Sequence, residues 1–237
     1  MYDYLLFLLL LIPCLIFSGW ASARVNSTFT AFDRVQTRSC MTGYDTAVRL
    51  MSRRGVHDIS VNRVDGKLTD HYHPTKKQVN LSMSSYGSTS VAAVAVAAHE
   101  VGHVMQKKSG YVPYRIRNAL VPVTNIGARL ALPLVIVGVL LDLFLTVTDV
   151  AVGQWLVYIG IALYGLSTLF MLVTLPVEYN ASARAVEWLQ TSHTMQGAQL
   201  AQAKEALSWA ARTYLVAALS AIASVLYYVF LILGRRD

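Results

Sequence analysis

The stretch Val91–His103, VAAVAVAAHEVGH, decides how the rest of this chain is interpreted. Its first eight residues are all alanine or valine, which indicates a buried helix, and its last five read H-E-x-x-H. Residues four apart on a helix lie on one face, so His99 and His103 present both imidazoles to one point. Two neutral imidazoles in this arrangement can bind a zinc ion. The motif therefore predicts a metal site on this helix.

Glu100 follows the first histidine and predicts a catalytic base beside that metal. A carboxylate at this place in the motif can take a proton from a water molecule that zinc activates. Activation lowers the pKa of the water toward ~7, and the resulting hydroxide can attack an amide carbonyl. The alternative is a pair of surface histidines with an exposed glutamate between them. The flanking alanine and valine residues disfavour that alternative.

The composition indicates an integral membrane protein. Of the 237 residues 55% are hydrophobic and only 14% are charged, whereas ordinary soluble domains contain ~25% charged residues. Four apolar segments approach or exceed the ~18–20 residues that cross a bilayer. These are residues 4–20, 130–147, 155–175 and 214–233. We expect one mostly α-helical, multi-pass membrane domain over residues 1–237, with about four transmembrane helices. Ala21-Ser22-Ala23 resembles a signal-peptidase site, but no lysine or arginine precedes the first segment, so a retained anchor is expected.

Two polar regions, residues 22–118 and 176–212, are expected to form a small α+β zincin-like catalytic region. Val56–Val64 and Gln78–Met83 alternate apolar and polar residues, which predicts two strands of a small antiparallel sheet ahead of the H-E-x-x-H helix. Ala47–Met51 predicts a short amphipathic helix with Val48, Leu50 and Met51 facing inward. Ser88 or Ser90 is the expected N-cap of the motif helix. A strand beside this helix has two equally plausible roles. Its edge could pair with an extended substrate, or the strand could only cover the helix.

A catalytic zinc site needs a third protein ligand and one open position. The candidates are His71, His73, Glu178, Glu187 and His193. Glu178 is favoured because it comes directly after an apolar segment, where an isolated carboxylate is costly. Two apolar segments separate it from His103, so the chain returns to the same side of the membrane. The alanines that follow it predict a helix that packs closely on the motif helix.

Other features of the sequence carry less weight. Cys14 and Cys40 predict no disulfide framework and no metal site. The net charge of +7 lacks the accompanying motifs of a nucleic-acid-binding protein. Asp142 lies in the second apolar segment. It is either a functional residue within the membrane or, with Asp149, a water-facing residue near the end of the segment. The candidates for stabilising an oxyanion are Tyr179, Arg184 and His193, each with a plainer structural alternative.

Several segments, taken in order, resemble the bacterial membrane-bound neutral zinc metallopeptidases of the YugP-like family. They are LTDHYHP (68–74), LS (81–82), VAAHEVGHVMQ (96–106), RNALVPVTNIG (117–127) and LPVEYNASARA (175–185). The resemblance implies a gluzincin-type peptidase with one zinc ion on His99, His103 and Glu178, and with Glu100 as general base. Better-known membrane gluzincins have an aspartate four residues after the ligand glutamate. Here that residue is Ser182, so Asn180 or another group is expected to support the zinc histidine.

Together these observations predict an endopeptidase of the cell membrane that acts on membrane proteins or on polypeptide segments close to the bilayer. One alternative is a non-catalytic membrane scaffold whose structural zinc has its fourth position filled by His71 or His73. Another is a zinc hydrolase of a non-peptide amide, such as a lipid amide. No nucleic-acid partner is expected. The distribution of lysine and arginine predicts a cytoplasmic catalytic face.

Overall fold

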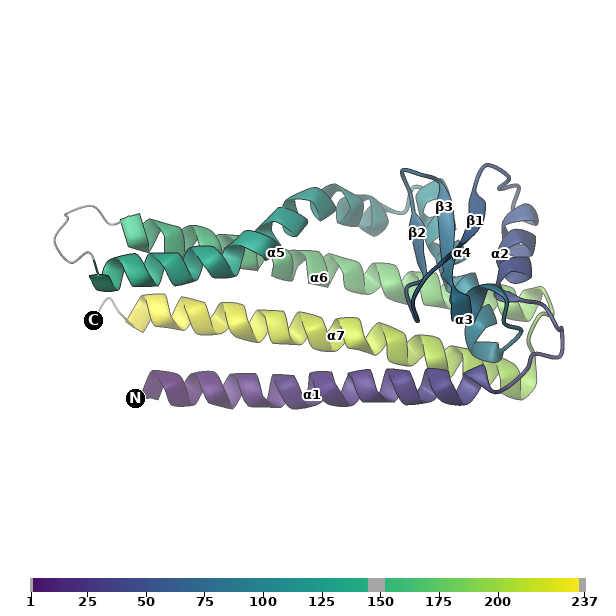
Figure 1. Ribbon diagram of the computed structural model, residues 1–237, viewed down its shortest axis with the longest axis horizontal. Coiled ribbons are helices and arrows are strands. Elements are labelled where there is room, and N and C mark those ends of the chain that lie inside the picture. Colours follow the sequence, from purple (N-terminus) through teal and green to yellow (C-terminus); the bar gives the residue numbers. More distant parts are fainter. Residues whose placement is uncertain (1, 145–151, 235–237) are drawn as a thin grey trace. The chain divides into compact units, whose positions relative to one another are not determined.

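The structure is a computed structural model that describes residues 2–144 and 152–234. The chain folds into two compact units. One unit comprises Met1–Gly19, Arg115–Leu175 and Tyr214–Asp237, and the other comprises Trp20–Tyr114 and Pro176–Thr213. The described part of the chain contains seven helices and one three-stranded sheet (Figure 1). The expectation of a mostly helical protein with a small sheet is confirmed.

Four long helices contribute to the first unit: α1 (Tyr2–Asp33), α5 (Val112–Phe144), α6 (Val152–Thr191) and α7 (Gly197–Gly234). Within the described residues, three helical segments are long and apolar enough to cross a membrane. They are Val112–Gly138, Val152–Thr191 and Gly197–Leu226. The predicted first transmembrane segment, residues 4–20, lies in α1, where many side chains fall outside the described set. Four transmembrane helices therefore remain a prediction.

The helices α5 and α6 form an antiparallel hairpin in this unit. A Cβ added at Gly138 would lie 2.5 Å from the carbonyl oxygen of Gly153, and one at Gly160 would lie 2.8 Å from that of Ala131. Later residues of α5 thus face earlier residues of α6. Glycine lets two membrane helices bring their backbones this close. The predicted return of the chain to the same side of a membrane stays a prediction.

The helices extend beyond the predicted apolar segments. The helix α5 begins at Val112, before the segment 130–147, α6 continues beyond residue 175 to Thr191, and α7 begins at Gly197, before the segment 214–233. Hydropathy changes along these helices, but nothing in the local sequence ends them. Asp149 and residues 145–147 lie outside the described residues, as does the side chain of Asp142.

The second unit contains the sheet and the short helices. The strands are β1 (Ser60–Val64), β2 (His71–His73) and β3 (Gln78–Ser82), in the order β1-β3-β2. The strand β1 pairs with β3 in parallel, with Ser60 opposite Gln78. The predicted antiparallel pairing of these two segments is therefore wrong. The strand β2, where the sequence favours a loop, makes the antiparallel pair with β3 instead, with His73 opposite Gln78.

Helix α4 (Val91–Lys108) forms the centre of this unit, and the other elements pack around it. Ser90 is its N-cap, as predicted, and accepts a hydrogen bond from the backbone N–H of Ala93. The residues between Val91 and Ala98 are all buried. Most of them pack in one apolar core with α2 (Gly43–Ser52), β3, the end of α6 and the first part of α7, and Ala92 and Val96 pack in a second cluster with Phe29 of α1 and Ala206 of α7. In α2 the predicted burial of Leu50 and Met51 is confirmed, whereas the prediction for Val48 is wrong, because its side chain is 39% exposed. Helix α3 (Met83–Tyr86) connects β3 to α4.

Candidate metal centre

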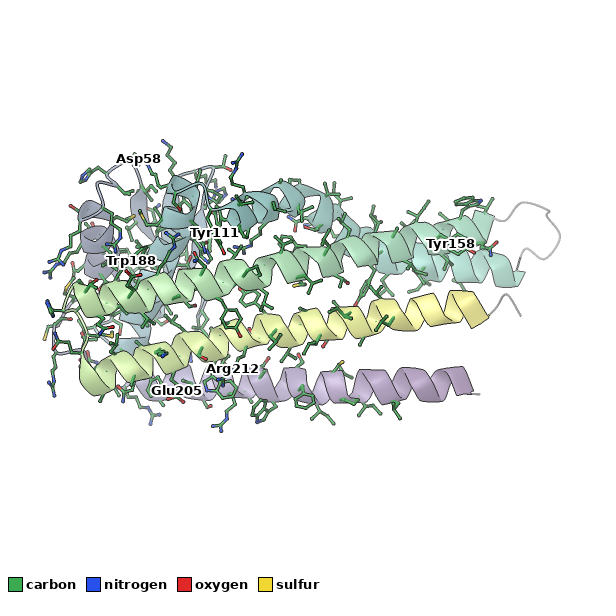
Figure 2. All side chains as sticks on the ribbon, turned by 180° about the vertical axis from the view of Figure 1, so that it is seen from behind. Asp58, Tyr111, Tyr158, Trp188, Glu205 and Arg212 are labelled. Atoms are coloured by element: carbon green, nitrogen blue, oxygen red, sulfur yellow. The ribbon has the colours of Figure 1, made fainter. Side chains whose placement is uncertain are left out.

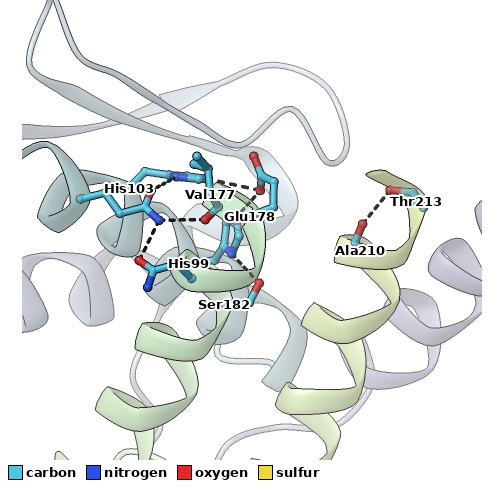
Figure 3. A network of polar contacts seen from close by, with 9 residues as sticks. His99, His103, Val177, Glu178, Ser182, Ala210 and Thr213 are labelled. Atoms are coloured by element: carbon cyan, nitrogen blue, oxygen red, sulfur yellow. Dashed lines mark hydrogen bonds and ion pairs between the residues drawn. The ribbon is translucent and has the colours of Figure 1, made fainter. Parts of the chain in front are cut away.

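Three side chains of the second unit converge where α4 meets the last part of α6. His99 and His103 come from α4 and Glu178 from α6, and their potential ligand atoms all lie within 4.8 Å of one another. The Nε2 atoms of His99 and His103 are 3.1 and 3.5 Å from Oε2 of Glu178 (Figure 3). The three side chains are between 4% and 13% exposed. Chain segments that are far apart in the sequence therefore form one compact, buried donor set.

This donor set fits a zinc ion. Two ligand atoms ~2.0–2.1 Å from zinc at a tetrahedral angle are ~3.3 Å apart, and the two nitrogen–oxygen distances lie on either side of this value. Two imidazoles and one carboxylate are a common protein donor set for catalytic zinc. The same distances also suit an imidazolium–carboxylate pair when no metal is bound. Among the described residues, no other group of three such side chains converges in this way.

The close approach of α6 to α4 brings Glu178 to the histidines. The two helices touch at Gly102, where an added Cβ would lie 2.7 Å from the carbonyl oxygen of Ala181. Ala181 and Ala185 are fully buried on the same part of α6. The predicted close packing of the helix that follows Glu178 is confirmed. Small residues on both helices are its physical cause.

Glu100 is buried beside this cluster with only 6% of its surface exposed. Burial raises the pKa of its carboxyl to about 7, and the charge of His99 opposes this rise. The backbone N–H of Tyr72 in β2 also donates a hydrogen bond to Glu100, which favours the charged form. A carboxyl with a pKa close to neutrality can both accept and release a proton at physiological pH.

Each histidine has a hydrogen-bond partner on its other ring nitrogen. Nδ1 of His99 lies 3.1 Å from Oγ of Ser182, and Nδ1 of His103 lies 2.9 Å from Oε1 of Gln106 (Figure 3). Such partners orient metal-binding imidazoles and set their protonation. Ser182 itself supports His99, at the place where the sequence lacks an aspartate. Sequence reasoning missed Gln106, although its spacing of three residues from His103 places it on the same helix face.

Comparisons with known proteins indicate the protein family. The model of a family described as "Putative neutral zinc metallopeptidase" matches residues 7–233. A Bacillus subtilis protein described as "Putative membrane protease YugP" is 36% identical over 233 residues, which are 98% of this chain and 99% of the relative. The chain belongs to this zinc metallopeptidase family. No solved structure gives a significant match.

The other candidate residues lie apart from the cluster in this member of the zinc metallopeptidase family. Nδ1 of His71 bonds to the carbonyl of Thr69, and its Nε2 contacts the side-chain amide of Asn80. His73 accepts a hydrogen bond from the backbone N–H of Lys76. His193 lies in the turn after α6 and contacts Gln196. Glu187 is exposed on α6.

Two residues near Glu178 have roles that the sequence does not predict. Asn180 does not bond to a histidine; its Oδ1 accepts hydrogen bonds from Nε2 of Gln106 at 3.0 Å and from Nε of Arg184 at 2.9 Å. Arg184 is therefore tied to its own helix. Tyr179, which is 43% exposed, lies outside the buried cluster. The proposed roles of Tyr179 and Arg184 at an oxyanion thus gain no support from these positions.

Proposed function

We propose that this protein is a membrane-integrated zinc endopeptidase whose metal ligands are His99, His103 and Glu178. The observation that carries the proposal is the convergence of these three side chains, with the buried Glu100 beside them. Zinc bound there would act as a Lewis acid that polarises a carbonyl and would lower the pKa of a water molecule. The family and the relative's description as a membrane protease support the same conclusion.

Glu100 is the proton-transfer group in this proposal. Its carboxylate would take a proton from the attacking water and return that proton to the leaving amine. The N–H of Tyr72 donates a hydrogen bond to Glu100 that would hold the carboxylate in place during both transfers.

A catalytic zinc is favoured over a structural zinc because, among the described residues, only three potential ligands converge at the site. The structural alternative needs His71 or His73 as a fourth ligand. Both histidines are engaged with their own strand and turn. Three protein ligands with one position open to water or substrate are typical of catalytic zinc.

Polypeptide is the proposed substrate, and β2 is the proposed place where it pairs. This strand is at the edge of the sheet and is tied to Glu100 through Tyr72. An extended peptide can add to such an edge by backbone hydrogen bonding, which a lipid amide cannot do. Glu178 follows the apolar segment that ends at Leu175 by three residues. Membrane proteins and polypeptide segments close to the bilayer are therefore the proposed substrate class.

The test is a comparison of the wild-type protein with Glu100→Gln in purified, zinc-loaded form. The substitution removes the proton acceptor and leaves the three proposed ligands intact. We expect cleavage of casein or of a membrane-protein substrate to fall by about 10²–10⁴-fold, since general acid–base catalysis contributes that much. Zinc content measured by elemental analysis should be unchanged.

Two outcomes would contradict the proposal. Cleavage by Glu100→Gln at the wild-type rate would remove Glu100 from the mechanism. A wild-type protein that binds zinc and hydrolyses a lipid amide but no polypeptide would favour the non-peptide hydrolase.

A further inference from the structure

A chain of buried polar groups continues from His103 away from the metal centre. Nδ1 of His103 contacts Oε1 of Gln106 at 2.9 Å. The Nε2 amide of Gln106 donates to the carbonyl oxygen of Val177 at 2.8 Å and to Oδ1 of Asn180 at 3.0 Å. Gln106 is fully buried in the centre of the second unit. Its side chain links α4 to α6 directly beside Glu178.

Arg184 is the last group in this series of hydrogen-bonded side chains. Its chemistry determines which atom is the donor and which is the acceptor in each of the other hydrogen bonds. Arg184 has only donors, so the Asn180 atom that its Nε contacts must be the oxygen. An oxygen that accepts from Arg184 must also accept from Gln106, so the Gln106 atom facing it is the amide nitrogen. The other end of the Gln106 amide is then an oxygen, which needs a donor.

A second anchor gives the same direction independently. The carbonyl oxygen of Val177 can only accept, so the Gln106 atom 2.8 Å from it must also be the amide nitrogen. Both anchors therefore leave Oε1 of Gln106 pointing at Nδ1 of His103. A hydrogen bond forms there only if Nδ1 carries a proton.

We propose that Gln106 is a positioning residue that keeps a proton on Nδ1 of His103, so that any lone pair on this imidazole is at Nε2. This inference rests on the proposed role of His103 as a metal ligand, because Nε2 is the atom that faces Glu178. His99 has no such constraint. Its partner is the hydroxyl of Ser182, which can donate or accept. The two histidines of the motif are thus held in different ways.

Gln106 would preorganise the His103 imidazole for metal binding. A histidine whose ring is already oriented, with its lone pair at the correct nitrogen, needs no ring flip or proton rearrangement on binding. Loss of a group that orients a ligand usually costs about 10–100-fold in metal affinity. The Gln106 side chain has the further effect of joining the two helices that supply the ligands.

The direct test is nitrogen NMR of histidine-labelled, full-length protein with its metal removed. A His103→Gln variant assigns the His103 signals. We expect the neutral imidazole of wild-type His103 to carry its proton on Nδ1 and not on Nε2. An unprotonated Nδ1 in the wild-type protein would overturn the inference, and that measurement needs neither zinc nor activity.

Variants of Gln106 provide the second test. Gln106→Met removes the acceptor but keeps the length of the side chain, and we expect a population of His103 with unprotonated Nδ1 and a 10–100-fold loss of zinc affinity in chelator competition. Gln106→Glu, as a buried neutral acid, keeps one oxygen for His103 and one donor for Val177, and should recover most of the affinity. Ser182→Ala is the matched control and should leave the His103 signals unchanged.

A purely structural role for Gln106 gives a different result. It predicts that Gln106→Met lowers thermal stability while the His103 signals and the zinc affinity stay at wild-type values, which would overturn the inference. If wild-type protein binds no zinc but its His103 keeps the protonated Nδ1, the proposed function fails and the assignment of the proton stands. If Gln106→Met does not fold, the wild-type spectrum still decides the question.

Discussion

Gly102, inside the H-E-x-x-H motif, determines how closely the two ligand-bearing helices approach. Its missing side chain leaves room for the backbone of Ala181, and the next turn of α6 carries Glu178. The two unspecified positions of the motif are therefore different in this protein. Val101 fills the buried core, whereas Gly102 allows the contact that brings Glu178 to the histidines.

Gly102→Ala should separate α6 from α4. The new Cβ would meet a backbone oxygen at 2.7 Å, which cannot move without shifting the helix. Overpacking of this kind costs about 1–3 kcal/mol, and we expect lower thermal stability together with lower zinc content. Gly87→Ala is the control, because an added Cβ there meets nothing within 4 Å. Equal stability and zinc content in the two variants would contradict the role given to Gly102.

Glu178→Ala should reduce zinc content and hydrolysis together, because it removes a carboxylate from the proposed donor set. Elemental analysis of purified protein measures the first and a cleavage assay the second. His193→Ala is the comparison variant, since His193 is a competing candidate in the sequence and contacts Gln196 in the structure. Loss of zinc in the His193 variant and not in the Glu178 variant would show that the ligand set is wrong.

The sequence is informative about this site where a spacing rule applies. His99 and His103 are four residues apart on a helix, and the position of Glu178 after two apolar segments brings it back to the same side. No spacing rule predicts the contacts of the Gln106 side-chain amide. A buried glutamine is recognisable only when its partners are known, and Val177 and Asn180 are distant in the sequence.

At the scale of the elements, the sheet shows what an alternating pattern leaves undetermined. Alternation indicates strands near residues 60–64 and 78–82, but it carries no information about their direction. The three-residue strand β2 between them reverses the chain twice and makes their pairing parallel. Its ends are held by side chains, since Asp70 accepts hydrogen bonds from the backbone N–H and the hydroxyl of Ser82. Such long-range contacts are not visible in a local pattern.

Asp58, just before β1, joins three elements through its carboxylate (Figure 2). It lies 2.7 Å from Nζ of Lys108 at the end of α4 and 3.0 Å from Nζ of Lys77 before β3. These two hydrogen bonds, with that of Lys108 the larger cause, lower the pKa of Asp58 to about 2. The ordinary value is ~3.9, so the folded state favours the charged carboxylate.

The stability that Asp58 contributes should therefore disappear in acid. Because its folded-state pKa lies below the unfolded-state value, the contribution is complete above the unfolded value and is lost as the pH falls toward about 2. We expect the difference in Tm between wild type and Asp58→Asn to shrink over this range. The carboxylate is exposed, so high salt should also shrink the difference. A difference that is independent of both pH and salt would refute this assignment.

At the scale of the whole molecule, the positive charges suggest an orientation in the membrane. Beside the sequence-predicted apolar stretches, on the side that carries the H-E-x-x-H motif, lie Arg24, Arg115, Arg117, Arg129, Arg184, Lys204 and Arg212. All of these except Arg24 fall within the longer candidate helical segments of the structure. Arg24 and Arg212 both place their guanidinium groups close to the ring of Trp209, at 5.5 and 4.4 Å from its centroid. Tryptophan is enriched at both membrane interfaces, whereas an excess of lysine and arginine favours the cytoplasmic side.

Cysteine labelling of intact cells tests the cytoplasmic orientation. In a background with Cys14 and Cys40 replaced by serine, a cysteine at Thr148 should react with an impermeant reagent. A cysteine at Lys107, near the end of α4, should react only after the cells are opened. Thr148 lies outside the described residues and serves here as a sequence position between two apolar segments. The reverse pattern of labelling would place the catalytic face outside the cell.

The order of the ligands along the chain has a consequence for biosynthesis. The motif helix α4 is synthesised first, and the whole of α5 and most of α6 must follow before Glu178 leaves the ribosome. A newly made α4 therefore carries two histidines and Glu100 but lacks the third donor. Under the proposed function, hydrolytic competence would begin only after the α5–α6 hairpin has been made and α6 has packed on α4. That order would keep the protein from cleaving neighbouring nascent chains during its own insertion.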